Sequence, residues 1–102
     1  MLDAAQQAAA FARGRERGDL AAGDIATHGL VRLIEIIGEA ASNVSPRGRA
    51  GLPSLDWPAI INMRHRIVHA YYDVNLDVVW RTVTTNLPPL IDELERHLAE
   101  TA

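Results

Sequence analysis

Residues 24–45 hold the longest stretch in which apolar side chains recur with the period of a helix and no proline intervenes. Asp24 precedes this stretch as an N-cap does, and Asn43 marks its end. On a helical wheel the polar residues fall in one narrow stripe, formed by His28, Arg32, Glu35 and Glu39. Apolar residues cover most of the rest, which is more than one bundle core requires. We therefore expect this helix to serve both the core and a subunit interface.

Helix start and stop signals predict four further helices around this one. The first is expected over residues 2–18 and begins at Asp3. The other three follow the N-cap residues Asp56, Asn75 and Asn86 and are expected over residues 57–72, 76–85 and 87–100. Glycines and prolines predict a loop over residues 45–54. The only strand-like feature is the Val and Thr content of residues 78–85, and no convincing strand pattern is present. The sequence therefore predicts an all-α, up-and-down bundle of about five helices.

Composition limits the class of protein further. A chain of 102 residues that is 48% hydrophobic fits a single domain over residues 1–102. No apolar run approaches the roughly 18–20 residues of a membrane span, and the N-terminus lacks a signal-peptide pattern, so we expect a cytoplasmic protein without a membrane contact. The absence of Cys excludes disulfides and thiolate zinc sites. A net charge of −3 argues against a broadly basic nucleic-acid surface, but a local cluster at residues 64–66 is compatible with RNA binding.

The stretch NMRHRIVHAYYDVN, residues 62–75, concentrates the candidate functional side chains. On a continuous helix Arg64 points into the apolar half, where a guanidinium must be paired or line a cleft. Glu35 and Glu39 are the candidate partners. His69 lies about 140° from Arg64 on that helix, so joint action requires a cleft where the two faces meet, which a two-fold dimer would supply. His65 and His69 also have the spacing of a metal pair, but no third ligand is evident and we expect no metal.

Three blocks of the sequence resemble the HepT-like branch of the HEPN ribonuclease superfamily: IGEA at 37–40, residues 52–75, and residues 78–94. The signature R-x4-H-x-Y of that family is met by Arg64, His69 and Tyr71. The resemblance implies an all-helical homodimer whose paired motifs line one cleft. It also implies a metal-independent RNase toxin whose partner, an MntA-type nucleotidyltransferase antitoxin, adenylylates the motif tyrosine Tyr71. The family commonly has Asn after the motif Arg, whereas this chain has His65.

The residue types suit cleavage of RNA without a metal or cofactor. An imidazole titrates near pH 6.5 in water, so His69 can carry a proton in either direction near neutral pH. Arg64 can hold a phosphate with two hydrogen bonds. We expect His65, Arg66 and Tyr72 to contact RNA, which could be tRNA or mRNA. The alternative is a non-catalytic helical subunit that binds a small nucleotidyltransferase.

Overall fold

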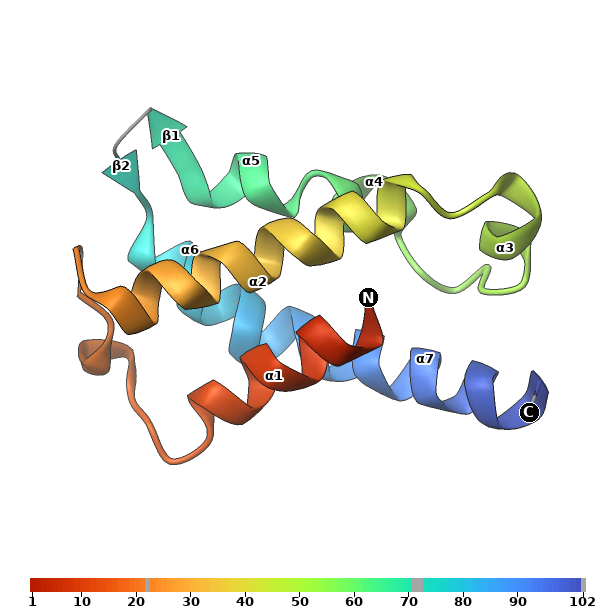
Figure 1. The fold of residues 1–102 in the computed structure, drawn as a ribbon, viewed down its shortest axis with the longest axis horizontal. Helices are drawn as coiled ribbons and strands as arrows, with labels where there is room; N and C mark the ends of the chain where they lie inside the picture. The colour runs from red at the N-terminus through yellow and green to blue at the C-terminus, as the bar shows by residue number, and fades with distance from the viewer. Residues whose placement is uncertain (22, 71–72, 102) are drawn as a thin grey trace.

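The computed structural model describes residues 1–21, 23–70 and 73–101, and its helices form a bundle around α2 (Ile25–Ser42). Figure 1 shows α2 between two layers. In that view α1 (Leu2–Ala12) and α7 (Leu87–Thr101) lie below α2, and α4 (Trp57–Ile61) and α5 (Met63–Ile67) lie above it. α2 packs on α1, α4 and α5, and α1 also packs on α7. The all-α fold class is thus confirmed.

The core follows the inner face of α2, where Leu30, Ile34 and Ile37 are fully buried. Other elements add the fully buried side chains Ile67, Val79, Val83 and Leu87. Each fully buried aliphatic side chain stabilises a fold by about 1.5–3 kcal/mol, so these residues hold the helices above and below α2 in place.

Gly38 sets the distance between α2 and α4. A Cβ atom at this position would lie 3.1 Å from the carbonyl oxygen of Ile61 and 3.5 Å from that of Ile60. Only glycine allows the two backbones to approach so closely without displacement. The close approach brings the chain that follows α4 alongside the polar stripe of α2.

The single helix predicted over residues 57–72 is wrong. The helix breaks at Asn62 between α4 and α5, and the chain then forms β1 (Val68–Ala70), which pairs antiparallel with β2 (Asp73–Val74). The Asn75 N–H donates to the Ile67 carbonyl oxygen at 2.7 Å, so the end of α5 has a partner from the residue that follows β2. β-Branched residues around this point favour the extended backbone.

The C-terminal helices also differ from the prediction. α6 (Leu76–Arg81) begins at Asn75 as expected, because the Asn75 side chain accepts a hydrogen bond from the Val78 N–H at 3.1 Å. The helix predicted over residues 87–100 is present as α7, but Asn86 lies inside continuous helix and does not cap it. A π-helical segment, η2 (Thr82–Asn86), continues α6 into α7, and the hint of a strand over residues 78–85 is wrong. Pro88 and Pro89 lack the N–H groups that an α-helix requires there and clash with carbonyls one turn before, which favours the wider turn.

The predicted loop over residues 45–54 contains one short helix, α3 (Pro46–Ala50). Ser45 caps it by accepting a hydrogen bond from the Gly48 N–H at 3.0 Å. A 3₁₀ turn, η1 (Arg17–Asp19), lies between α1 and α2, and Arg17 forms an ion pair with Asp77 on α6 at 2.6 Å. None of the helices in the described chain is both long and apolar enough to cross a membrane.

Candidate active site

Arg64 lies on α5 and forms an ion pair with Glu35 on α2. The Nε atom of Arg64 and the Oε1 atom of Glu35 are 3.4 Å apart. The Arg64 side chain is 55% exposed and the Glu35 side chain 23% exposed. The expectation that Arg64 points into the apolar half is therefore wrong, because the helix breaks at Asn62 and the wheel of a continuous helix does not apply. The expectation of a carboxylate partner is met by Glu35.

The contact with Glu35 uses only one edge of the Arg64 guanidinium. Within the described part of the chain, the two terminal nitrogens of Arg64 make no hydrogen bond. These nitrogens are the ones that can hold two oxygens of a phosphate in parallel. Among the described residues, Arg64 is thus paired on its Nε side with a partly buried carboxylate, and its terminal nitrogens have no hydrogen-bond partner there.

The polar stripe of α2 extends this contact into a row of alternating charges. Arg32 lies 3.3 Å from Glu35 and also 3.3 Å from Glu39, so Glu39 pairs with Arg32 rather than with Arg64. Exposed ion pairs such as these contribute only about 0–1 kcal/mol each to stability. They place Arg32 between the two carboxylates, on the same stripe as the partner of Arg64.

Sequence reasoning placed Arg32 and His28 on the polar stripe of α2 but assigned them no part in a site. In the structure both residues lie beside Glu35. They line a hollow of about 190 Å³ together with Glu35 and Val31. The signal that could have found Arg32 is its spacing of three residues from Glu35 and seven from Glu39, which places all three on one helix face.

The other residues of the motif follow Arg64 along the chain. His69 belongs to β1, of which the structure describes the backbone but not the side chains. Tyr71 and Tyr72 lie outside the described residues, so the predicted roles of His69, Tyr71 and Tyr72 stay predictions. His65 is exposed on α5, next to Arg64.

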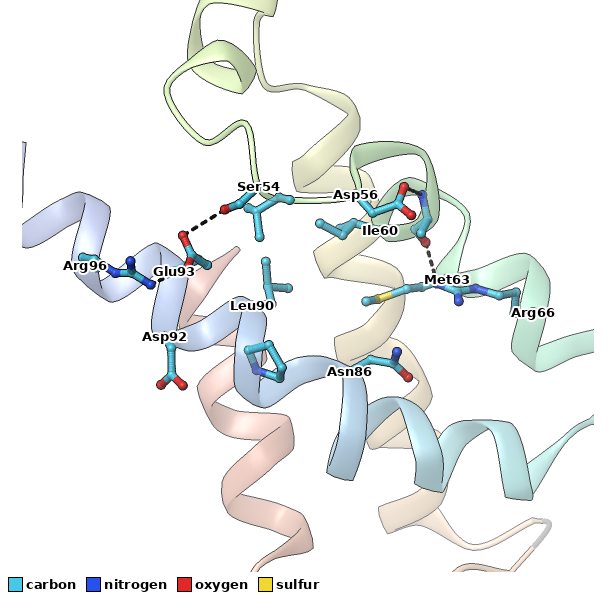
Figure 2. A pocket seen from close by; sticks show the side chains of 13 residues that line it. Ser54, Asp56, Ile60, Met63, Arg66, Asn86, Leu90, Asp92, Glu93 and Arg96 are labelled. Carbon is cyan, nitrogen blue, oxygen red and sulfur yellow. Dashed lines mark hydrogen bonds and ion pairs between the residues drawn. The ribbon is translucent and has the colours of Figure 1, made fainter.

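Arg66 takes a different direction from Arg64. Its terminal Nη2 donates to the Ala59 carbonyl oxygen at 2.7 Å, and its side chain lines a cavity of about 560 Å³ between α4, α5 and α7 (Figure 2). Residues two apart on a helix point to nearly opposite sides. The predicted RNA contacts of Arg66 therefore belong to another surface than those of Arg64.

Possible metal ligands are dispersed in the part of the chain that the structure describes. No group of three or more His, Asp or Glu side chains lies close enough together there to hold an ion.

An all-helical bundle in which Arg64 of an R-x4-H-x-Y segment pairs with Glu35 of α2 agrees with the HEPN class that the sequence blocks resemble. The chain belongs to the ribonuclease HepT-like family, whose sequence profile matches residues 1–97. The resemblance seen in the three sequence blocks is thereby confirmed.

Individual relatives carry corresponding names. A probable ribonuclease HepT of Thermococcus cleftensis is 34% identical over 67 residues, which are 66% of this chain and 61% of the relative. A candidate RNase of Caldanaerobacter subterraneus is 34% identical over 76 residues, which are 74% of this chain and 64% of the relative. The matched region therefore spans about three fifths of the length of these relatives. No solved structure is a significant match to the chain.

Proposed function

We propose that this protein is a metal-independent endoribonuclease in which Arg64 and His69 form the catalytic pair. The observation that carries the proposal is the Arg64–Glu35 ion pair in a chain of the ribonuclease HepT-like family. Glu35 holds the Nε edge of Arg64, so the outer edge of the guanidinium is available to a phosphate. A charge that is held before the substrate arrives needs little reorganisation when negative charge develops in the transition state.

The reaction that suits these groups is an attack by the RNA on its own backbone. A base removes the proton of the ribose 2′-OH, the 2′-oxygen bonds to the adjacent phosphorus, and the bond from phosphorus to the 5′-oxygen breaks. An acid protonates the leaving 5′-oxygen, which gives a 2′,3′-cyclic phosphate and a 5′-hydroxyl end. An imidazole can serve as base or acid, and Arg64 stabilises the charge on the phosphate oxygens.

We further propose that two copies of the chain form one cleft and that a small nucleotidyltransferase of the MntA type controls it. In this scheme the Tyr71 hydroxyl oxygen attacks the α-phosphorus of ATP, pyrophosphate leaves, and AMP stays bound to the tyrosine. The added phosphate carries negative charge and matches the anion that Arg64 recognises. A tethered AMP would therefore compete with RNA for Arg64. In this scheme the ribonuclease is the toxin, and the nucleotidyltransferase that inhibits it is the antitoxin.

The test is cleavage of RNA by the purified protein in the presence of EDTA. Positioned acid–base catalysis contributes about 10²- to 10⁴-fold, so His69→Ala should lose activity by at least that lower factor while its helical circular dichroism stays the same. His97→Ala, at the far end of α7, provides a histidine control. Cleavage that requires an added divalent ion and is lost with either His65 or His69 would instead identify a metal pair.

The same preparation distinguishes the alternative function. A non-catalytic subunit would bind the nucleotidyltransferase and accept AMP but would cut no RNA, with or without EDTA. Intact masses of wild type and Tyr71→Phe after incubation with the transferase, ATP and magnesium test the modification. Whole AMP additions on wild type alone support Tyr71 as the acceptor, and identical labelling of Tyr71→Phe rejects it.

A further inference from the structure

The cavity of about 560 Å³ that Arg66 lines is separate from the Arg64–Glu35 pair and has an apolar floor. Figure 2 shows Ile60, Met63 and Leu90 at its centre, and all three are buried. At one end, the Ser54 hydroxyl donates to Glu93 at 3.0 Å and Arg96 pairs with Glu93, which closes that end with satisfied polar groups. Its volume lies within the roughly 300–1,000 Å³ that is common for ligand pockets.

The other end of the cavity presents polar groups that are still available. Asn86 and Arg66 lie there beside Met63 (Figure 2). The Asn86 amide has no hydrogen-bond partner within the described chain, and Arg66 has one, the Ala59 carbonyl, which occupies only Nη2. Both side chains are exposed. An apolar floor with a few convergent polar groups is the usual composition of a small-molecule or nucleotide site.

The backbone gives Asn86 an unusual setting. Asn86 is the last residue of the π-helical segment η2, and π-helical turns inside longer helices occur frequently at functional sites. Arg66 comes from α5, the same short helix that carries Arg64. Arg64 and this cavity are therefore separated by about the diameter of one helix, roughly 10–12 Å. An RNA strand that contacts Arg64 through a phosphate could span that distance and reach the cavity.

We propose that this cavity is a subsite for one unpaired adenine base of the substrate RNA, close to the nucleotide that is cleaved. An Asn side chain can make two hydrogen bonds to adenine, accepting from N6 and donating to N7. The guanidinium plane of Arg66 can stack on the base, and Met63 and Leu90 supply the apolar contact. This inference rests on the proposed ribonuclease function and adds to it a preference for sequence.

The experiment compares short RNAs that carry A, C, G or U at single positions on either side of the cleaved bond. A two-bond Asn–adenine contact discriminates by roughly 5- to 150-fold, so wild type should show a kcat/KM higher by that factor with A at one of these positions. Asn86→Ala should reduce the preference for A over U to within about 2-fold. Asn86→Asp should move the preference toward C, because a carboxylate only accepts hydrogen bonds and pairs with the cytosine amino group.

A binding measurement keeps the inference independent of catalysis. Uncleavable 2′-O-methyl RNAs with A or U at the same position should show the same ratio in Kd for wild type, and that ratio should disappear in Asn86→Ala. Asn43→Ala removes an exposed Asn that does not line the cavity and should leave both ratios unchanged. If Asn86→Ala loses helical circular dichroism, Asn86→Leu replaces it with the same expected loss of preference, because Leu has a similar size and a higher helix propensity but makes no hydrogen bond.

The outcomes separate the two proposals. If wild type cuts no RNA but prefers A-containing uncleavable RNA through Asn86, the proposed function fails and the subsite stands. If wild type cuts RNA but treats all four bases alike in cleavage and in binding, the subsite is overturned. A preference for A that survives Asn86→Ala overturns it as well, as does the lack of any RNA binding.

Discussion

At the scale of single residues, Glu35 and Glu39 make a matched pair for testing how Arg64 is held. Both lie on the polar stripe of α2 and both pair with Arg32, but only Glu35 contacts Arg64. Glu35→Gln should therefore lower kcat/KM for RNA cleavage by roughly 10- to 100-fold, because small displacements of a positioned group have effects of that size. Glu39→Gln should change kcat/KM by less than about 3-fold, since it leaves Arg64 and its contact intact.

The division of that loss between kcat and KM identifies the role of Glu35. If Glu35 positions Arg64 for the transition state, kcat should fall and KM should change little. A rise in KM with an unchanged kcat would mean that the Arg64–Glu35 pair stabilises the bound substrate and the transition state equally. Equal losses in Glu35→Gln and Glu39→Gln would contradict a specific role, because then the total charge of the stripe would matter and not the contact.

Arg49 shows how a basic residue in a predicted loop can be structural. Its side chain donates to the Val44 carbonyl at 3.1 Å and to the Ala41 and Ser42 carbonyls at 3.4 Å, and its guanidinium lies 5.8 Å from the centre of the Trp57 ring. The last carbonyls of a helix otherwise lack partners. Arg49→Ala should therefore lower the free energy of unfolding by about 1–2 kcal/mol in urea titrations.

Arg47 is the control for that prediction. It is exposed on the same short helix α3, and its replacement by Ala should change the free energy of unfolding by no more than about 0.5 kcal/mol. A similar loss in both variants would indicate that the charge of α3 matters and that the capping contacts of Arg49 do not.

At the scale of elements, the starts of α4 and α6 could be predicted because their causes are local. Asp56 accepts from the Ala59 N–H at 3.1 Å, and Asn75 accepts from the Val78 N–H at 3.1 Å, as their sequence positions indicate. The end of α5 could not be predicted in this way. It depends on the Asn75–Ile67 backbone hydrogen bond, which forms only after the chain has turned back through β1 and β2.

The candidate site was predictable to a similar degree. The sequence indicates a carboxylate on α2 as the partner of Arg64, because two Glu residues share its polar stripe. It does not distinguish Glu35 from Glu39, since that choice depends on where α4 and α5 lie along the axis of α2. The close approach of Gly38 to the Ile61 carbonyl oxygen fixes that position. This packing contact has no local signal in the sequence.

The close contact at Gly38 gives a prediction for the packing of α2 on α4. Ala has a helix propensity about 1 kcal/mol better than Gly, so Gly38→Ala would stabilise a free helix. In the bundle the new Cβ would lie 3.1 Å from the Ile61 carbonyl oxygen, and overpacking of this kind costs about 1–3 kcal/mol. We expect Gly38→Ala to lower the free energy of unfolding by about 1 kcal/mol.

Gly18 provides the comparison. It lies in η1, and nothing comes within 4 Å of the Cβ position there. Gly18→Ala should be neutral or raise the free energy of unfolding by up to about 1 kcal/mol. If Gly38→Ala stabilised the protein as much as Gly18→Ala, α2 and α4 could move apart without loss of stability. The close packing of these two helices would then not position Arg64.

At the scale of the whole molecule, one face of α2 is left uncovered. Ile25 is 87% exposed, Arg32 is exposed, and no atom of the described residues lies within 4 Å of the Cβ position of Gly29. These residues recur every three to four positions with Arg32 among them, so they follow one side of the helix. Such a face beside Arg64 is where the dimer expected from the sequence would form, since covering it would also enclose the space next to the site.

We therefore expect the free protein to be a dimer at micromolar concentration in light scattering. Ile25→Glu places a charge in the proposed contact and should shift the mass toward the monomer. RNA cleavage should fall in the same proportion, because the proposed cleft needs residues of both copies. Leu98→Glu, which changes an exposed apolar residue on α7, should leave mass and activity unchanged. A wild-type monomer that cleaves RNA at full rate would show that one copy of Arg64 and His69 is sufficient, and the uncovered face of α2 would then need another occupant.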